Sequence, residues 1–511
     1  MEVSKQVRHA ALAVLLASNG FWLPVSAHSF ASSAVTDPAL DLLLTREAQR
    51  LLDNHLFDNA RQANITVRAS VDVVQGRLLI EFGPGILPAE DDHSVEEIEQ
   101  FIRNTLEEYA QQAGVRELDT QILYEGKPYL EHFPDAAVIR SGRAGHMTRT
   151  DTALVSAGHG LLRVHPGGEW EFQRPSVNGI QEDLTTATLA DELQQLLQDR
   201  GELRVERARR GGVDPHPESA RPWAEMSARY HLKDRLPDRS DIWNHFANST
   251  ANNREVLDDI RARPQYANHL GVSGMLSIHT NAESSGAARG ARVYYHSSKP
   301  ADRGLANMTL CYMREIITAQ EAYAEFPVAP SGGTADHGEN RLATMPSIVV
   351  ETAFHTNAQD AAALQDPVFR TAAMKGVEKG FRLFRDGKDC QPLTVEKITD
   401  VETPSGGRSE VEVHFKGFPQ FPVTLEVAYA NCQPGWICDG GNVVIRDPVE
   451  SPIRFLVECG GGNGGSSRWR TTMRDADGVK AAPMEHQQTC LAATPPAPTR
   501  AVGQMKLAGR P

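Results

Sequence analysis

The sequence predicts an α/β fold: a mostly parallel open sheet with helices on both faces, preceded by a small α+β domain and followed by an all-β sandwich. Through the middle of the chain, short apolar strands alternate with amphipathic helices, which favours a parallel sheet covered on both sides. The preceding segment mixes strands and helices. The last segment has short alternating strands separated by Gly and Pro turns, a pattern typical of a β-sandwich.

A chain of 511 residues predicts about three domains, at roughly 150 residues each. Composition shifts and turn-rich stretches set the expected boundaries. We expect a signal peptide at 1–27, a small α+β accessory domain at 38–135, a catalytic domain at 150–388, a β-sandwich domain at 391–490 and a disordered tail at 491–511.

The first residues have the features of a secretory signal peptide. Lys5 and Arg8 precede a mostly apolar stretch at 10–25, and Val25-Ser26-Ala27 is a small-residue cleavage site. Cleavage there predicts an exported protein, periplasmic or extracellular. The alternative is an uncleaved anchor, although polar residues at 18–20 interrupt a stretch already short for a span. No later stretch approaches ~20 apolar residues, so we expect no membrane span after cleavage.

Charge argues against nucleic acid as a partner. The formal net charge is −14, and Lys and Arg do not cluster on any predicted helix face. A hydrophobic content of 40% and a charged content of 23% are ordinary for a soluble globular protein.

The cysteines favour disulfides rather than a thiolate metal site. Five of the six lie in the last quarter of the chain, and none forms a C-x-x-C motif. We expect Cys432 and Cys438 to form a short bridge. Cys311 lies in a helix-like stretch and is expected to be a free buried thiol.

In the accessory domain, the spacing of apolar residues predicts a helix at 40–58 and a clear amphipathic helix at 94–113. Alternation predicts a hairpin from strands at 65–74 and 77–82, and a further strand at 118–124. The domain shows no cluster of catalytic residue types.

The catalytic domain alternates strands and helices, with polar loops and short helices at 211–253. The predicted strands are 153–156, 203–205, 273–279, 293–295 and 347–351, and the predicted helices are 182–201, 301–320 and 360–384. The sandwich strands are expected at 395–398, 411–415, 423–428, 443–445 and 454–457.

Chemically useful side chains follow three of the central strands. His159 lies in A-G-H-G, His279 in S-I-H-T-N, and Glu351 closes an apolar strand. Ligands of open α/β sheets bind beyond the carboxyl ends of the strands, so we expect these residues to converge there. Each could instead be structural, but Glu351 would be costly to bury without a partner.

With Glu182, which opens a helix, these residues form a possible zinc site. Two imidazoles and a carboxylate suit Zn²⁺ and leave one position for water, and Glu351 could accept that water's proton. Taken alone, Glu182 could simply interact favourably with the helix dipole.

The stretch from about 154 to 384 resembles the zinc-dependent N-acetylmuramoyl-L-alanine amidases. The shared features are A-G-H-G at 157–160, an acidic residue opening a glycine-terminated helix at Glu182, Arg263 before Ala267-Asn268, S-I-H-T-N-A at 277–282, and Glu351 followed by Phe354 and Asn357. This resemblance implies a peptidoglycan amidase that cuts between N-acetylmuramic acid and L-alanine. It implies His159, Glu182 and His279 as zinc ligands and Glu351 as catalytic acid and base.

Two loops depart from compact members of that family. They span 161–181 and 211–253, and we expect both to border the substrate cleft. The rival functions are a zinc peptidase acting on cell-wall stem peptides and a cell-envelope binding protein without turnover. The flanking domains suggest peptidoglycan binding, or docking to a cell-envelope activator.

Overall fold

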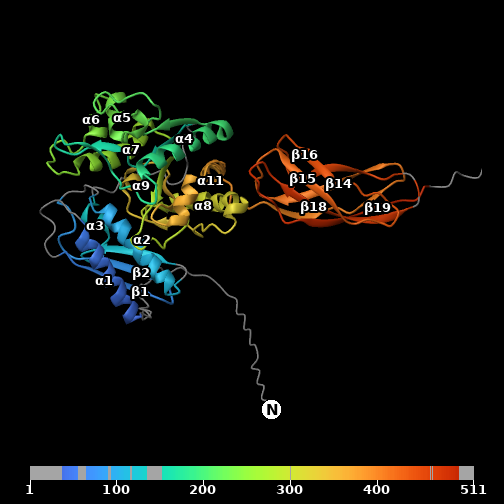
Figure 1. Cartoon of the computed structure of the whole chain (residues 1–511), viewed down its shortest axis with the longest axis horizontal. Coiled ribbons are helices and arrows are strands. Elements are labelled where there is room, and N and C mark those ends of the chain that lie inside the picture. Colours follow the sequence, from blue (N-terminus) through green and yellow to red (C-terminus); the bar gives the residue numbers. More distant parts are fainter. Residues whose placement is uncertain are drawn as a thin grey trace, which may run out of the picture.

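The computed structural model describes residues 37–55, 65–89, 94–115, 118–134, 152–299, 301–460, 462 and 464–493. The predicted signal peptide and nearly all of the predicted tail lie outside these residues. Figure 1 shows three groups of elements in chain order, the last of them extending away from the other two. Within the described ranges, no helix is long and apolar enough to cross a membrane.

The first group is a three-stranded sheet packed against helices. It comprises α1 (Pro38–Asn54), β1 (Val67–Asp72), β2 (Arg77–Phe82), α2 (Glu96–Gln112), β3 (Asp119–Tyr124) and α3 (Tyr129–His132). The predicted hairpin is confirmed, because β1 and β2 are antiparallel; β3 lies parallel to β2. Ile98, Ile102 and Leu106 recur at helical spacing and bury one side of α2 in this group's own core.

The middle group contains the predicted open sheet. Its six strands run in the order β10-β9-β11-β8-β4-β7, and only the β9–β11 pair is antiparallel. The bounds are β4 (Thr152–Ala157), β7 (Arg204–Arg207), β8 (Met275–Asn281), β9 (Arg292–Tyr295), β10 (Gly333–Thr334) and β11 (Ser347–Phe354). The mostly parallel sheet is therefore confirmed.

Helices cover both faces of this sheet, as predicted. On one face, α4 (Glu182–Gly201), α8 (Asp302–Ile317) and α11 (Pro367–Arg385) share a core with Val155, Ile278 and Val350. On the other, α5 (Ala228–Arg235) and α7 (Arg254–Leu270) pack against Leu154 and Met275. Successive strand residues point to opposite faces, which separates the two cores.

Shorter elements complete the middle group. They are β5 (Leu161–Arg163), β6 (Trp170–Phe172), α6 (Ser240–Trp243), α9 (Gly338–Leu342), α10 (Ala358–Gln365) and the 3₁₀ turns Trp223–Glu225 and Glu321–Tyr323. One predicted helix is wrong: 360–384 is divided between α10 and α11. Pro367 disfavours helical backbone at Asp366 and suits a first helical position, and the Asp366 carboxylate accepts the Val368 amide.

The last group, which we call the β group, is all β, as predicted. One sheet has the order β12-β14-β17 and the other β13-β19-β18-β15-β16. The bounds are β12 (Thr394–Ile398), β13 (Val401–Thr403), β14 (Arg408–Lys416), β15 (Val423–Asn431), β16 (Gly441–Ile445), β17 (Ile453–Glu458), β18 (Gly465–Arg474) and β19 (Met484–Cys490). Asp477 joins this group to the middle one by accepting Arg200 at 2.8 Å and Lys375 at 2.9 Å.

The disulfides correct one prediction. Cys432–Cys438 forms as expected, and Cys459–Cys490 is a second bridge in the β group. Cys311 is not a free thiol, because it bonds to Cys390 and ties α8 to the segment after α11. A helical setting does not reveal a partner 79 positions away in the sequence.

Close contact between α8 and α11 yields a stability prediction. A Cβ at Gly376 would lie 2.4 Å from the Met313 backbone. Alanine favours helix over glycine by about 1 kcal/mol, whereas overpacking a core costs about 1–3 kcal/mol. We therefore expect Gly376→Ala to lower the free energy of unfolding in denaturant titrations. Equal or greater stability would contradict this close packing.

Candidate metal centre

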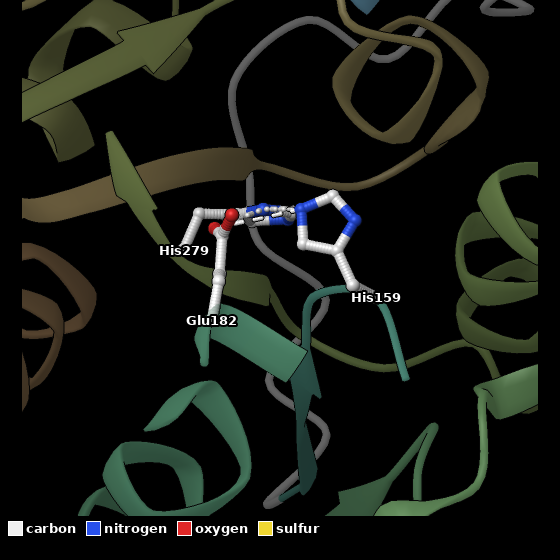
Figure 2. A group of neighbouring side chains, drawn as sticks. All are labelled: His159, Glu182 and His279. Carbon is white, nitrogen blue, oxygen red and sulfur yellow. Dashed lines mark hydrogen bonds and ion pairs between the residues drawn. The ribbon is translucent and has the colours of Figure 1, made fainter. Parts of the chain in front are cut away.

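Three side chains from three elements meet at the carboxyl end of the sheet (Figure 2). His159 lies in the turn after β4, Glu182 is the first residue of α4, and His279 lies near the end of β8. All three are buried. The predicted convergence of the two histidines with Glu182 is therefore present in the structure.

The distances fit a single tetrahedral metal ion. His159 Nε2 lies 3.2 Å from His279 Nδ1 and 3.4 Å from Glu182 Oε1, and Glu182 Oε1 lies 3.7 Å from His279 Nδ1. Metal–ligand bonds of about 2.0–2.1 Å place tetrahedral ligand atoms about 3.3 Å apart. The three atoms thus form one face of a tetrahedron, which leaves a fourth position for a non-protein ligand.

The glycines around His159 make this approach possible. His159 has φ of 58°, and Gly160 has φ of 120° and packs against the Ser227 backbone. A Cβ at Gly158 would lie 2.3 Å from the His279 ring. The A-G-H-G turn therefore requires glycine on one side for space and on the other for a left-handed backbone.

Polar partners orient both imidazoles. His279 Nε2 lies 2.9 Å from Glu339 Oε2, and Arg263 donates to Glu339 Oε1 at 2.6 Å. This arrangement places the Nε2 proton toward Glu339 and leaves Nδ1 to face the other two ligands. His159 Nδ1 lies 3.4 Å from Gln173 Oε1, so both rings are held through their outer nitrogens.

Sequence reasoning missed Glu339 as a partner of His279. It comes from α9, a five-residue helix without a periodic pattern. Its link to the site is Arg263 of α7, which is almost wholly buried and therefore needs a carboxylate partner. That burial is visible only in the folded chain. The second partner of Arg263 is Asp259, at 3.0 Å.

The charges around the three ligands favour a cation. Burial opposes ionisation of Glu182, but His159 and His279 hold its pKa well below the usual range. Burial also disfavours protonated His279, yet Glu339 and Glu182 raise the pKa of that ring to about 10. A ligating imidazole must be neutral at its donor nitrogen, so metal binding at Nδ1 releases a proton.

Glu351 lies beside this centre without joining the ligand triangle. It is the register neighbour of His279 on β11, and burial raises its pKa to about 7, against the opposing effect of His279. Its Oε1 accepts a 2.6 Å hydrogen bond from Gln100 of α2. Its Oε2 is buried and has no hydrogen-bond partner in the described part of the chain. This side chain can exchange a proton near neutral pH.

Comparison with protein families gives a match over the middle group. Residues 154–382 match the family described as N-acetylmuramoyl-L-alanine amidase, and these residues include all three ligand candidates and Glu351. A search of curated proteins found no match.

Solved structures of similar proteins include three such amidases. The catalytic domain of CwlV from Bacillus (Paenibacillus) polymyxa var. colistinus has 17% identity and a TM-score of 0.32, covering 47% of this chain and 100% of that one. An enzyme from Clostridium difficile 630 has 17% identity and a TM-score of 0.30, covering 46% and 97%. Ami1 from Mycobacterium smegmatis has 17% identity and a TM-score of 0.31, covering 48% and 100%. Scores this low add nothing to the family match.

Glu339 yields a test of the metal centre. Loss of the carboxylate that orients a ligating histidine typically weakens metal affinity 10–100-fold. We expect Glu339→Gln to do so in competitive titrations of the folded protein with a divalent metal. Glu321→Gln, at an exposed position on a 3₁₀ turn, is the matched control. Unchanged affinity in both variants would remove Glu339 from the support of this centre.

Proposed function

We propose that this chain, whose residues 154–382 match the N-acetylmuramoyl-L-alanine amidase family, is a zinc hydrolase of that family in which Glu351 transfers the proton. The family's reaction is hydrolysis of the amide between N-acetylmuramic acid and the L-alanine of the stem peptide. The observation that carries the proposal is the triangle of His159, Glu182 and His279 with Glu351 alongside.

The donor set supports Zn²⁺ as the metal. Two imidazole nitrogens and one carboxylate oxygen with an open fourth position are a ligand set of catalytic zinc sites. When bound, Zn²⁺ would polarise the amide carbonyl and lower the pKa of a coordinated water. His159, Glu182 and His279 would hold the ion, with Glu339 fixing the His279 ring.

Glu351 is suited to the proton transfers of amide hydrolysis. Its carboxylate would accept a proton from the attacking water and return it to the leaving nitrogen. The two roles require a group that is ionised before attack and protonated after it. A pKa near 7 meets both requirements at neutral pH.

The three disulfides support the proposal that the enzyme works outside the cytoplasm, in the periplasm or beyond the cell. The family match implies peptidoglycan as the substrate. We extend this to the other elements: the first group (38–135) and the β group (391–490) would serve as accessory domains that bind the cell envelope or an activator.

Glu351→Gln tests the proton-transfer role. Removal of a general acid–base group typically costs 10²–10⁴-fold in rate. We expect a loss of this size in the zinc-loaded protein acting on purified cell wall, with zinc content unchanged. Near-normal turnover with zinc still bound would contradict the role. Products are identified by mass: intact stem peptides support the amidase, and shortened peptides would indicate a peptidase. No products from either the parent protein or its Gln100→Ala variant would indicate a binding protein.

The pKa of Glu351 predicts a pH profile. Because burial raises this pKa, the active carboxylate is lost as pH falls through about 7. A bound cation favours the ionised carboxylate and so opposes this rise. In the zinc-saturated enzyme we therefore expect kcat/KM to rise with pH along an acidic limb at or below about 7 and then level off. Saturating zinc removes proton competition at His279 from the profile. An acidic limb with the same midpoint in the residual activity of Glu351→Gln would contradict Glu351 as the base.

A further inference from the structure

Helix α2 of the first group reaches the catalytic centre. The Gln100 carboxamide on this helix donates from Nε2 to Glu351 Oε1 at 2.6 Å, across 251 positions of sequence. For Glu351 to give its proton to the leaving nitrogen of a substrate, that nitrogen must lie within hydrogen-bond distance of the same carboxyl group. Gln100 therefore holds the position where the proposed reaction needs the scissile amide.

Further contacts continue along the same side of α2. Asn104 Nδ2 donates to Asn281 Oδ1 at 2.6 Å and to the Ala282 carbonyl at 3.1 Å, two and three residues after His279. Glu107 accepts from Arg292 at 2.7 Å, and Arg292 is the register partner of Glu351 on β9. These contacts lie at the end of the sheet that carries the metal centre.

Two residues at the start of α2 contact neighbours of the residues at the metal centre. Glu97 pairs with Arg174 at 2.9 Å, and Arg174 Nε lies 3.8 Å from Glu182 Oε2. Glu96 accepts from the Gly338 amide at 2.7 Å, one residue before Glu339. One helix thus contacts Glu351 and the neighbours of Glu182, His279 and Glu339.

Helical periodicity explains how α2 serves two surfaces. Gln100, Asn104 and Glu107 recur at spacings of three and four and face the middle group, while Ile98, Ile102 and Leu106 face their own core. The contacts across the boundary are amide hydrogen bonds and ion pairs. Polar interfaces of this kind between domains typically permit relative motion.

A glycan strand cannot reach the centre in this arrangement. His159, Glu182, His279 and Glu351 are each less than a tenth exposed. If Gln100 served only to orient Glu351, α2 would still block a polymer substrate from the metal centre. The helix and the substrate therefore cannot occupy the centre at the same time.

We propose that α2 is a pseudosubstrate helix that closes the cleft of the resting enzyme, with the Gln100 carboxamide in place of the scissile amide. When α2 withdraws, Asn281, Arg292 and Arg174 become free to bind polar groups of the glycan and the stem peptide. The inference rests on the proposed function, because it identifies Glu351 as the base that the helix covers.

Two variants of α2 distinguish a helix that blocks the active site from a helix that assists catalysis. In the full-length zinc-loaded protein, Gln100→Ala should raise kcat/KM on soluble peptidoglycan fragments at least 10-fold. It should also speed removal of zinc by a chelator, a readout independent of turnover. Gln111→Ala, on the same helix but exposed, should change neither rate. A lower or unchanged kcat/KM for Gln100→Ala, with unchanged zinc release, would overturn the proposal.

A reversible cross-link tests whether the helix must move. Thr105 Oγ1 and Ser284 Oγ lie 3.4 Å apart across the boundary. We expect Thr105→Cys with Ser284→Cys to be inactive and slow to lose zinc when oxidised, and to recover on mild reduction. The parent protein under the same reductant controls for its own disulfides. Full activity of the oxidised double variant would show that α2 need not withdraw.

The two readouts distinguish failure of this inference from failure of the proposed function. Cleavage of the muramyl amide by all variants, with equal rates of cleavage and zinc release, would overturn the pseudosubstrate helix and leave the amidase intact. Absence of cleavage in every variant, with faster zinc release from Gln100→Ala, would overturn the amidase while supporting a helix that covers the centre.

Discussion

The arrangement of the middle group depends on one interaction, the approach of two imidazoles and a carboxylate to within 3.2–3.7 Å of one another. A carboxylate buried as deeply as Glu182 is costly without compensating charge. The structure supplies part of that compensation through Arg174 and the two rings. A divalent cation at the centre of the triangle would bind this carboxylate and both ring nitrogens, which is why we assign the ion to these three groups.

The residues that orient the two imidazoles both bind one carboxylate of α7, that of Asp259. Gln173, which contacts His159, donates to Asp259 at 3.2 Å, and Arg263, which holds Glu339 beside His279, donates to the same carboxylate at 3.0 Å. Both imidazoles are therefore positioned by residues that meet at Asp259. Such outer partners fix ring orientation and tautomer, so this network is as much a part of the centre as the three ligands.

Local sequence predicted much of this because the informative patterns were local. His159 and His279 were recognisable from glycines and strand ends within a few residues, and the alternation of strands with helices implied which edge of the sheet they share. Glu339, Gln100 and the Cys311–Cys390 bridge were not predictable in the same way. Each is defined by a partner brought close only by tertiary packing, and nothing in the flanking residues identifies that partner.

The two flanking groups contact different ends of the middle group. Helix α2 lies on the carboxyl end of the sheet, beside Glu351. The β group instead attaches through Asp477 to Arg200, which is 18 residues along α4 from Glu182, roughly 27 Å at helical rise. The first group can therefore control access to the centre, whereas the β group can bind a surface or partner without obstructing it.

The most direct measurement of the central claim is zinc X-ray absorption spectroscopy of the full-length protein loaded with one equivalent of the ion. We expect a first shell of nitrogen and oxygen only, at about 2.0–2.1 Å, with two imidazoles in the parent protein and one after His279→Ala. A sulfur shell at about 2.3 Å, or two imidazoles persisting in that variant, would place the ion elsewhere and contradict the account.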